Sequence, residues 1–342
     1  MKAVIFKQHG GPEVLEYAEA PDPTIKANEI LVEVKACALN HLDVWARGGL
    51  PGIEIPLPHI LGSDIAGVVR EVGELVSWVR AGDEVMLQPG VSCGHCAECL
   101  AGRDNLCRDY DMLGYRRDGG YAQFVAAPAV NVIPKPKNLG WEEAAALPLV
   151  TVTAWHMLVT RAAVQPGEDV LIQAAGSGVG SIGIQVAKLR GARVIATASS
   201  DEKLAKAKEL GADEVVNYTR DDWPKEVKRL TNRKGVDVVF EHTGAATWPG
   251  SIVSLRNNGR LVTCGATSGF AAQVDIRHIF YRHLTIFGSF MGSKSELLEA
   301  MKFIESGKIR AVVDQTLPLA EARRAHELME DRAQFGKLVL VP

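Results

Sequence analysis

The chain has 342 residues, with 38 Lys+Arg against 41 Asp+Glu, which gives a formal net charge of −3. Because a domain typically holds roughly 100–200 residues, this length predicts two domains with a sizeable core in each. Hydrophobic residues make up 47% and charged residues 23%, values that exclude disorder, collagen-like structure and coiled coil. The balanced charge, without a run of Lys or Arg, lacks the electrostatic pattern of a nucleic-acid binder.

Neither a signal peptide nor a membrane span is expected. Lys7 interrupts the first apolar residues before a signal sequence can form. The longest uncharged stretch, 144–160, is shorter than the ~20 apolar residues that a span needs, and it predicts a buried helix or a domain junction. Four of the six cysteines lie between positions 93 and 107, which favours a metal site in a reducing compartment over a disulfide framework. We therefore expect a cytoplasmic protein.

The first 130 residues predict short strands broken by turn residues. Residues 30–35 alternate between apolar and polar, and 65–72 and 84–87 are apolar runs ended by Gly or Pro. After Pro166 the pattern changes to strands that alternate with helices. The strands are expected at 170–174, 193–197, 214–216, 236–240 and 260–264, and the first two helices at 182–189 and 201–210. The last 50 residues add a helix at 295–306 and a closing strand at 337–341.

Alternation of strands and helices predicts a doubly wound parallel sheet of the Rossmann type. The β-rich segments at the two ends of the chain predict a second domain into which this α/β domain is inserted. The expected boundaries are 1–150 plus 291–342 for the β-rich domain and 151–290 for the α/β domain.

The cysteine cluster has the spacing of a structural zinc loop. Cys93, Cys96 and Cys99 are each separated by two residues, and Cys107 follows eight positions after Cys99. Four thiolates bind zinc tetrahedrally and leave no open position for substrate, so the expected zinc, one per chain, is structural. An iron–sulfur cluster uses the same ligand type, and four reduced cysteines without metal are the remaining alternative.

A glycine-rich turn, 173–180, joins a buried strand to an amphipathic helix. In such a turn small residues let the backbone approach a pyrophosphate, and the helix N-terminus supplies N–H donors. The expected cofactor contacts are Gly176, Ser177, Gly178, Val179 and Gly180. The motif reads Gly176-x-Gly178-x-x-Ser181 and so departs from Gly-x-Gly-x-x-Gly. A tight turn without a ligand is the alternative.

The end of the next strand predicts which nucleotide binds. An NAD site places Asp or Glu about 20 residues after the turn, where it binds the ribose 2′-hydroxyl. Ala198 stands at that place, and Ser199, Ser200 and Lys203 follow as candidate partners of a 2′-phosphate. The sequence therefore favours NADPH over NADH, although Ser200 is also a typical helix N-cap.

Taken together, these motifs resemble the medium-chain dehydrogenase/reductase family over essentially the full length of the chain, in the branch of quinone oxidoreductases and zinc-type alcohol dehydrogenases. The resemblance implies a GroES-like catalytic domain in the β-rich part and a Rossmann cofactor domain. It rests on the cysteine loop, the glycine-rich turn and the segments 38–43 (ALNHLD), 61–67 (LGSDIAG), 82–85 (GDEV) and 210–213 (LGAD).

The catalytic zinc ligands of the alcohol dehydrogenases are missing. That branch binds a catalytic zinc through Cys, through His with a neighbouring Glu, and through a later Cys or Asp. The resemblance aligns these positions with Asn40, Ser63, Asp64 and Leu149, and the proton-relay Ser/Thr with Leu42. This set lacks the soft nitrogen and sulfur ligands that zinc prefers. An unconventional zinc site built from His41, His59 and Asp64 stays open as an alternative.

The quinone-reductase branch also has Asn where the catalytic cysteine would be. The resemblance accordingly implies Asn40, Asp43 and Thr153 near the reacting groups, with Asn40 as donor to the acceptor oxygen. It places His41, Tyr218 and Lys337 near the cofactor phosphates. A structural ion pair between Asp43 and Arg47 is the alternative role of that carboxylate.

These observations predict an NADPH-dependent reductase that transfers hydride to a quinone or an α,β-unsaturated carbonyl without a catalytic metal. A zinc-dependent alcohol dehydrogenase with unusual ligands is the first alternative, and a non-catalytic NADPH-binding protein is the second. The expected partner is a small-molecule substrate, with neither nucleic acid nor membrane. A homodimer or homotetramer is expected, with the edge strand before Gly288 as the candidate interface.

Overall fold

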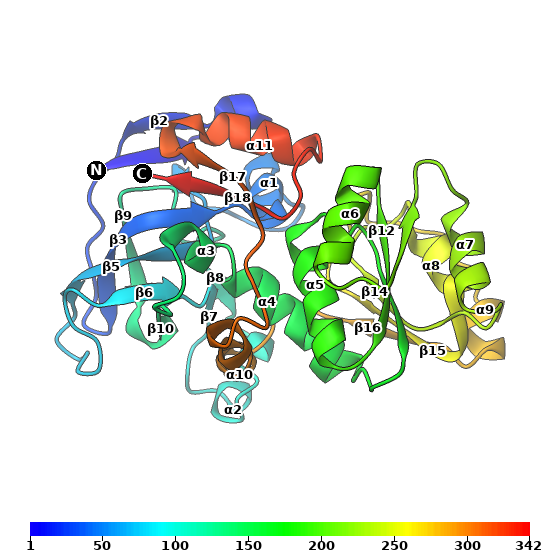
Figure 1. Cartoon of the computed structure of the whole chain (residues 1–342). Coiled ribbons are helices and arrows are strands. Elements are labelled where there is room, and N and C mark those ends of the chain that lie inside the picture. The colour runs from blue at the N-terminus through cyan, green and yellow to red at the C-terminus, as the bar shows by residue number, and fades with distance from the viewer. The chain divides into compact units, whose positions relative to one another are not determined.

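The computed structural model describes residues 1–342, which form two compact units, and Figure 1 shows their elements. Unit 1 consists of Met1–Leu149, Ser293–Leu298 and Ala311–Pro342, and unit 2 of Val150–Gly292 and Glu299–Arg310. The segment 299–310 thus departs from the expected assignment to the β-rich domain. It belongs to unit 2 because Phe303 packs on Trp155, with ring centroids 5.4 Å apart, and the Arg310 backbone bonds to the Gln185 side chain.

Unit 1 is built around one long strand, β3 (Glu29–Ala38), whose side chains alternate between buried and half-buried positions. This strand pairs antiparallel with β5 (Asp64–Val72), β9 (Phe124–Pro128) and β18 (Lys337–Val341). The sheet runs β10–β6–β5–β3–β18–β17, completed by β6 (Glu84–Leu87), β10 (Val132–Pro134) and β17 (Val313–Pro318). The last strand of the chain therefore lies inside the sheet, next to one of the first.

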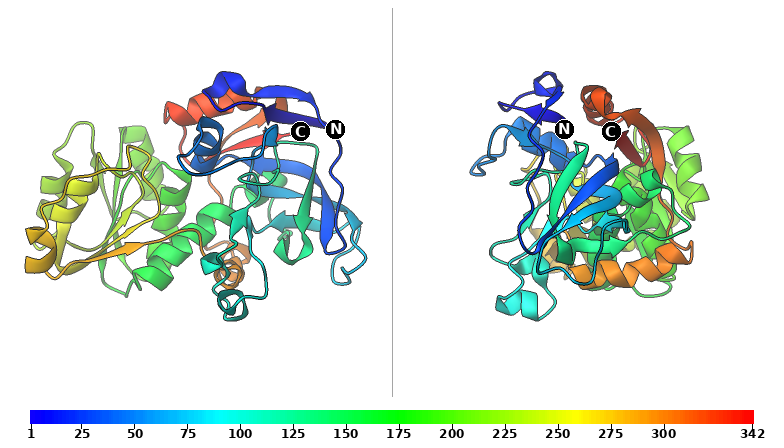
Figure 2. Two further views of the ribbon diagram at one scale, coloured as in Figure 1. Left: turned by 180° about the vertical axis from the view of Figure 1, so that it is seen from behind. Right: turned by 90° about the vertical axis from the view of Figure 1, so that its left-hand side faces the viewer.

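Two smaller sheets complete the β-rich unit. The first contains β2 (Glu16–Glu19), β1 (Lys2–Phe6) and β4 (His59–Ile60), and the second contains β7 (Gly90–Val91) and β8 (Asp111–Met112). The helices of this unit are α1 (His41–Gly48), α2 (Ala97–Leu100), α3 (Trp141–Ala145) and α11 (Ala322–Glu330). Figure 2 shows that both chain ends lie in this unit.

Unit 2 is a six-stranded parallel sheet in the order β13–β12–β11–β14–β15–β16. This order, with the first strand of the unit at the centre, is the classical strand order of a dinucleotide-binding sheet. Its strands are β11 (Asp169–Ile172), β12 (Arg193–Ala198), β13 (Glu214–Asn217), β14 (Val236–Glu241), β15 (Leu255–Thr263) and β16 (Thr285–Gly288). The predicted Rossmann-type sheet is therefore confirmed.

Helices cover both faces of this sheet. Figure 1 shows α5 and α6 on one side of the strands, and α7, α8 and α9 on the other. Their bounds are α5 (Gly178–Leu189), α6 (Asp201–Glu209), α7 (Trp223–Leu230), α8 (Trp248–Ser254) and α9 (Arg277–Tyr281). The next helix, α10 (Lys294–Glu305), begins in unit 1 and ends in unit 2.

The uncharged stretch 144–160 is largely buried. It forms the end of α3, the helix α4 (Pro148–Trp155) and part of a π-helical segment (His156–Arg161), and the boundary between the units falls inside α4. The stretch is thus both a buried helix and a junction. None of the helices has the length and apolar character that a membrane crossing requires.

Candidate functional site

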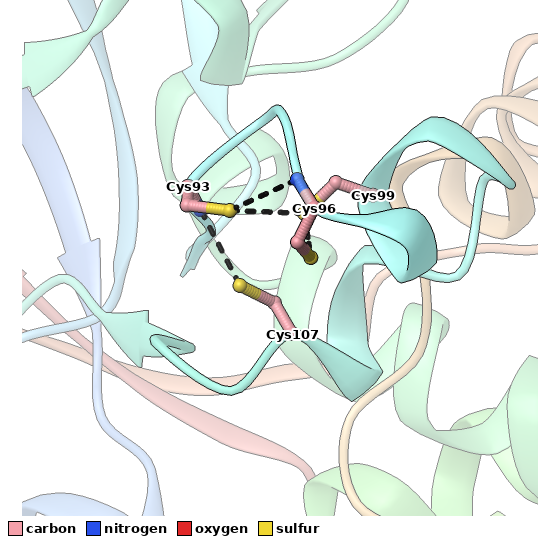
Figure 3. Close-up of side chains that lie close together, drawn as sticks. All are labelled: Cys93, Cys96, Cys99 and Cys107. Atoms are coloured by element: carbon pink, nitrogen blue, oxygen red, sulfur yellow. Dashed lines mark hydrogen bonds between the residues drawn. The ribbon is translucent and has the colours of Figure 1, made fainter.

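The cysteine loop gathers its four thiols around one point, as Figure 3 shows. The sulfur atoms of Cys93, Cys96, Cys99 and Cys107 all lie within 4.8 Å of one another. Cys96 and Cys99 begin and continue the short helix α2, and Cys107 follows a 3₁₀ turn at Asp104–Leu106. Gly94 and Gly102 have φ values of 78° and 73°, so the turns that fold the loop use conformations that favour glycine.

The geometry and charge of the loop fit zinc. Tetrahedral zinc with Zn–S distances of about 2.3 Å separates its sulfurs by about 3.8 Å. Here the Cys96–Cys99 and Cys93–Cys99 sulfur distances are 3.5 and 3.9 Å. Backbone N–H groups of His95 and Cys96 lower the pKa of Cys93 to about 6, which favours the thiolate that a metal needs. The four cysteines can hold a structural zinc ion, and a closed set of four sulfurs leaves substrate no access to it.

A buried ion pair occupies the region that the resemblance aligns with the catalytic zinc. Lys337 Nζ donates to Asp64 Oδ2 at 2.9 Å and to Asn40 Oδ1 at 2.6 Å, and Asn40 Nδ2 donates to the same Asp64 oxygen at 2.9 Å. The three residues are 4%, 0% and 6% exposed. The structure thus places Lys337, expected near the cofactor phosphates, against Asn40 and Asp64 of its own unit.

The remaining aligned positions supply no metal ligand set. The backbone N–H of Leu149 donates to Asp64 Oδ1 at 2.8 Å, so each oxygen of this carboxylate is engaged. The Ser63 hydroxyl is fully buried and has no hydrogen-bond partner. The four cysteines form the group of metal-binding side chains in the structure, and His41, His59 and Asp64 do not come together as a second.

Asp43 holds two loops of this region together. Its carboxylate accepts hydrogen bonds from the backbone N–H of Asn40 at 2.8 Å and of Gly62 at 3.2 Å, and from the Tyr121 hydroxyl at 3.2 Å. Burial raises the pKa of Asp43 to about 6. The residue is fully buried and acts on the backbone that carries Asn40 and Ser63.

The alternative role of Asp43, an ion pair with Arg47, is not found. Arg47 instead pairs with Glu330 of α11 and donates to His326 Nδ1 at 2.9 Å. His326 Nε2 lies 3.3 Å from the Tyr121 hydroxyl. Burial and the nearby Arg47 charge lower the pKa of His326 to about 3, which keeps the imidazole neutral. One chain of hydrogen bonds therefore runs from Arg47 through His326 and Tyr121 to Asp43. The four-residue spacing of Asp43 and Arg47 in the sequence predicts a direct ion pair and does not indicate this longer path.

In unit 2, the glycine-rich turn has the form of a phosphate site. Ala174 has a left-handed φ of 46°, and Ser177 caps α5 by accepting a hydrogen bond from Gly180 N–H at 2.9 Å. The N–H groups of Gly178 and Val179, at the first turn of the helix, have no intrahelical partner and can meet a phosphate.

The glycines that pack closely here are not at the three positions, Gly176, Gly178 and Ser181, that the motif predicts. A Cβ on Gly180 would lie 2.5 Å from the Ala174 carbonyl oxygen, and one on Gly183 would lie 3.2 Å from the Phe240 ring. Ser181, which stands at the third position of the predicted motif, is buried, and its hydroxyl donates to the Gly178 carbonyl oxygen of the same helix at 2.9 Å. The close approach that the motif requires is therefore met by Gly180 and Gly183, and the turn fits a pyrophosphate.

The end of β12 carries the residues expected to select the nucleotide. Ala198 is buried, and its carbonyl accepts from Tyr218 N–H at 3.1 Å, which places Tyr218 beside it. Ser200 is the N-cap of α6 and accepts from Lys203 N–H at 3.3 Å. Ser199 is half-buried and bonds through its carbonyl to Thr219.

The first carboxylate that follows this strand in the sequence is already paired. Asp201, the first residue of α6, accepts from Asn217 Nδ2 at 3.2 Å and from Arg220 at 3.3 Å. Arg220 thus adds a cation beside the predicted serines, although the sequence gives it no motif. The role of Arg220 becomes visible only once β12 is paired with β13, because their register brings Ala198 opposite Asn217, three residues before Arg220.

Thr153 and His41, the remaining predicted site residues, lie in different units. Thr153 is a buried residue of α4 in unit 2, with its hydroxyl 4.0 Å from the Met291 sulfur. His41 is the first residue of α1 in unit 1, where its ring meets the Trp45 ring edge-on at 5.0 Å between centroids.

Comparison with known proteins agrees with this geometry. The alcohol dehydrogenase GroES-like domain model matches residues 26–137, and the zinc-binding dehydrogenase model matches residues 178–306. A curated alcohol dehydrogenase of Geobacillus stearothermophilus is 35% identical, over 99% of both chains. The chain belongs to the medium-chain dehydrogenase/reductase family. Its members are oxidoreductases of the alcohol dehydrogenase superfamily, and this chain is one of them.

Other members that match differ in the activity they are named for. A crystal structure of an NAD-dependent alcohol dehydrogenase is 54% identical, covers 100% of both chains and superposes with a TM-score of 0.97. The quinone oxidoreductase 1 of Escherichia coli is 32% identical over 98% of both chains. The crotonyl-CoA reductase of Streptomyces collinus is 33% identical over 94% of this chain and 80% of its own. The family thus includes alcohol, quinone and enoyl-thioester chemistry.

Proposed function

We propose that this protein is an NADPH-dependent reductase that transfers hydride to a quinone or an α,β-unsaturated carbonyl without a catalytic metal. The observation that carries the proposal is the Asn40–Asp64–Lys337 cluster, because the resemblance aligns Asn40 and Asp64 with the catalytic zinc site of the family's alcohol dehydrogenases. An ammonium, a carboxylate and an amide already satisfy one another there. Without a Lewis acid, alcohol oxidation loses several kcal/mol of assistance.

Quinones and enones suit such a site because they contain their own electron sink. When bound, NADPH supplies a hydride to the electron-poor carbon, and the electron pair moves to the carbonyl oxygen of the acceptor. The protein has to position the acceptor and hydrogen-bond the oxygen on which the charge develops. Asn40 can do so, because Nδ2 has two N–H groups and donates one of them to Asp64. Water supplies the proton that completes the reduction.

The proposed preference for NADPH rests on the end of β12. No carboxylate occupies position 198, and Asp201 is paired with Asn217 and Arg220. Ser199, Lys203 and Arg220 are the proposed partners of the 2′-phosphate. Ala198→Asp should weaken NADPH binding by charge repulsion and spare NADH, as measured by nucleotide fluorescence titration. An unchanged affinity for NADPH would place the phosphate elsewhere and contradict this assignment.

The activity is tested with a panel of quinones, enones and alcohols on zinc-loaded protein. We expect NADPH-dependent reduction of quinones or enones that persists with about one zinc per chain. Oxidation of ethanol or benzyl alcohol that disappears with a chelator and returns with zinc would instead establish a zinc alcohol dehydrogenase. NADPH binding without turnover of any acceptor would indicate a binding protein.

We also propose a homodimer or homotetramer that assembles through the outer strand of unit 2. β16 pairs only with β15 and is the edge of the sheet. Ile286 of this strand is exposed, as are Phe280 and Tyr281 of α9. Light scattering coupled to size-exclusion chromatography should give at least twice the chain mass, and Ile286→Lys should lower it. A wild-type monomer would contradict the proposal.

A further inference from the structure

The Asn40 side chain is held by two opposite charges. Lys337 carries only donors and faces Oδ1, whereas Asp64 carries only acceptors and faces Nδ2. A rotated amide would set its oxygen against a carboxylate and its NH₂ group against an ammonium. The two charges therefore fix the orientation of the amide.

The same contacts change the donor strength of the amide. A cation at the amide oxygen draws electron density from the nitrogen, and hydrogen bonds in series strengthen one another in a low-dielectric interior. Lys337 is 4% exposed and lies 2.6 Å from Oδ1, so water screens this effect little. The N–H of Asn40 that is not donated to Asp64 is thereby made a stronger donor.

The backbone of Asn40 is fixed as firmly as its side chain. Its N–H donates to Asp43 at 2.8 Å, and Asp43 is held in turn by Gly62 and Tyr121. The backbone and the side-chain amide of Asn40 are therefore both held in place before any ligand binds, and one N–H of Nδ2 is left to donate to a ligand.

We propose that Lys337 is a positioning residue that acts through Asn40: its ammonium orients and polarises the amide that stabilises the acceptor oxygen. The inference rests on the proposed function. In the step, the hydride forms a new C–H bond at the electron-poor carbon. The π electrons of the C=C bond move to form a new C=C bond with the carbonyl carbon, and the π electrons of the C=O bond move onto the oxygen, which becomes an enolate. The nicotinamide is oxidised and the acceptor is reduced. Lys337 keeps its proton throughout, and the enolate takes its proton from water.

This role differs from a contact with the cofactor phosphates, and single-turnover kinetics separates the two. Lys337→Met should slow hydride transfer about tenfold or more, with an increased isotope effect from 4-deuterated NADPH. The affinity for NADPH should change less than about twofold. Lys337→Arg, which keeps the charge, should recover part of the rate. Loss of NADPH affinity at an unchanged rate would overturn the inference.

Two further variants guard against a merely structural effect. Lys135 is another buried lysine of unit 1, 3.2 Å from Glu84, and Lys135→Met should leave the hydride rate unchanged. If Lys337 acts through Asn40, then Lys337→Met should have no further effect on the rate in an Asn40→Ala background. Independent, additive losses would overturn the inference. Asp64→Asn/Lys337→Met provides a charge-balanced background if Lys337→Met alone folds poorly.

A spectroscopic measurement is independent of turnover. The side-chain amide resonance of Asn40, assigned by its loss in Asn40→Ala, should shift in Lys337→Met and stay in place in Lys135→Met. An unmoved resonance overturns the inference even if enones are reduced. A shifted resonance in a protein that reduces no quinone or enone overturns the proposed function and leaves the polarised amide standing.

Discussion

The resemblance aligns two regions of unit 1 with the two zinc sites of the family's alcohol dehydrogenases, and the two regions differ in how they are assembled. The cysteine loop takes four ligands of one kind from residues 93–107. The Asn40–Asp64–Lys337 cluster joins three kinds of group, and Lys337 lies 297 positions after Asn40 in the chain. The first arrangement needs a metal to be complete, because four thiolates repel one another. The second is complete without one, because its charges balance.

Positions that the resemblance aligns with a metal site thus hold an organised polar centre. They contain neither cysteine nor histidine, yet the region is neither apolar nor empty of charge. Asp64 and Lys337 are both buried, and each pairs with the other and with Asn40. The region thus holds a buried ammonium next to Asn40, and the carboxylate of Asp64 balances its charge.

The largest effect is expected in the cysteine loop. Cys93→Ser removes one ligand, so we expect zinc content to fall from about one per chain to near zero and the melting temperature to fall by more than about 10 °C. Elemental analysis and calorimetry measure both. Cys264→Ala, which changes a cysteine of unit 2, serves as the control and should retain zinc. Retention of zinc by Cys93→Ser would show that the loop does not hold it.

The next effect tests the balance of charge in the second region. Lys337→Met leaves the Asp64 carboxylate buried without its cation, which should lower the free energy of unfolding by about 3–5 kcal/mol. Asp64→Asn/Lys337→Met removes both charges and should recover most of this loss. Urea denaturation measures the difference. Equal stability of Lys337→Met and wild type would mean that the pair carries no electrostatic weight.

A smaller effect concerns the hydrogen-bond chain beneath Asn40. Because the pKa of His326 is lowered to about 3, its unfolded form takes up a proton below about pH 6.5 while the folded form does not. Stability that is present above pH 6.5 is therefore lost as the pH falls. Between pH 7 and pH 4 the wild type should lose about 3 kcal/mol more than His326→Gln. Parallel denaturation curves at both pH values would contradict this.

The smallest effect returns to the cysteine loop. Arg103 pairs with Glu98 at 2.7 Å, but both side chains are substantially exposed. Since exposed pairs contribute little, Arg103→Ala should leave zinc content and the melting temperature unchanged. A loss of zinc in this variant would show that surface charge, and not only the thiolates, retains the metal.

The sequence predicts most of the fold because its signals are local. The strands 84–87 and 337–341 and the helix that begins at Asp201 follow from apolar spacing and end residues, and they form as predicted. The cysteine loop is equally local. The Lys337–Asp64 pair is not local, because no sequence pattern around either residue indicates the other as its partner. The same holds for the path from Arg47 to Asp43, which requires the packing of α11 before His326 and Tyr121 meet.

The register of the glycine-rich turn shows a second limit. Glycine spacing alone suggested Ser181 as the third position, because Gly176 and Gly178 have the spacing of the first two. The closely packed glycines are Gly180, against Ala174 of the turn, and Gly183, against Phe240 of β14, and only the folded arrangement of α5 over these two residues reveals them.

The position of β18 inside the sheet of unit 1 sets an order for biosynthesis. Asp64 leaves the ribosome 273 residues ahead of the lysine that neutralises it, and at about 5–20 residues per second that interval lasts tens of seconds. Unit 2, which ends at Arg310, has its whole sequence available earlier. The nascent chain can therefore complete unit 2 while unit 1 still waits for β18, and a chain truncated before residue 337 lacks the ammonium that neutralises the buried Asp64 carboxylate.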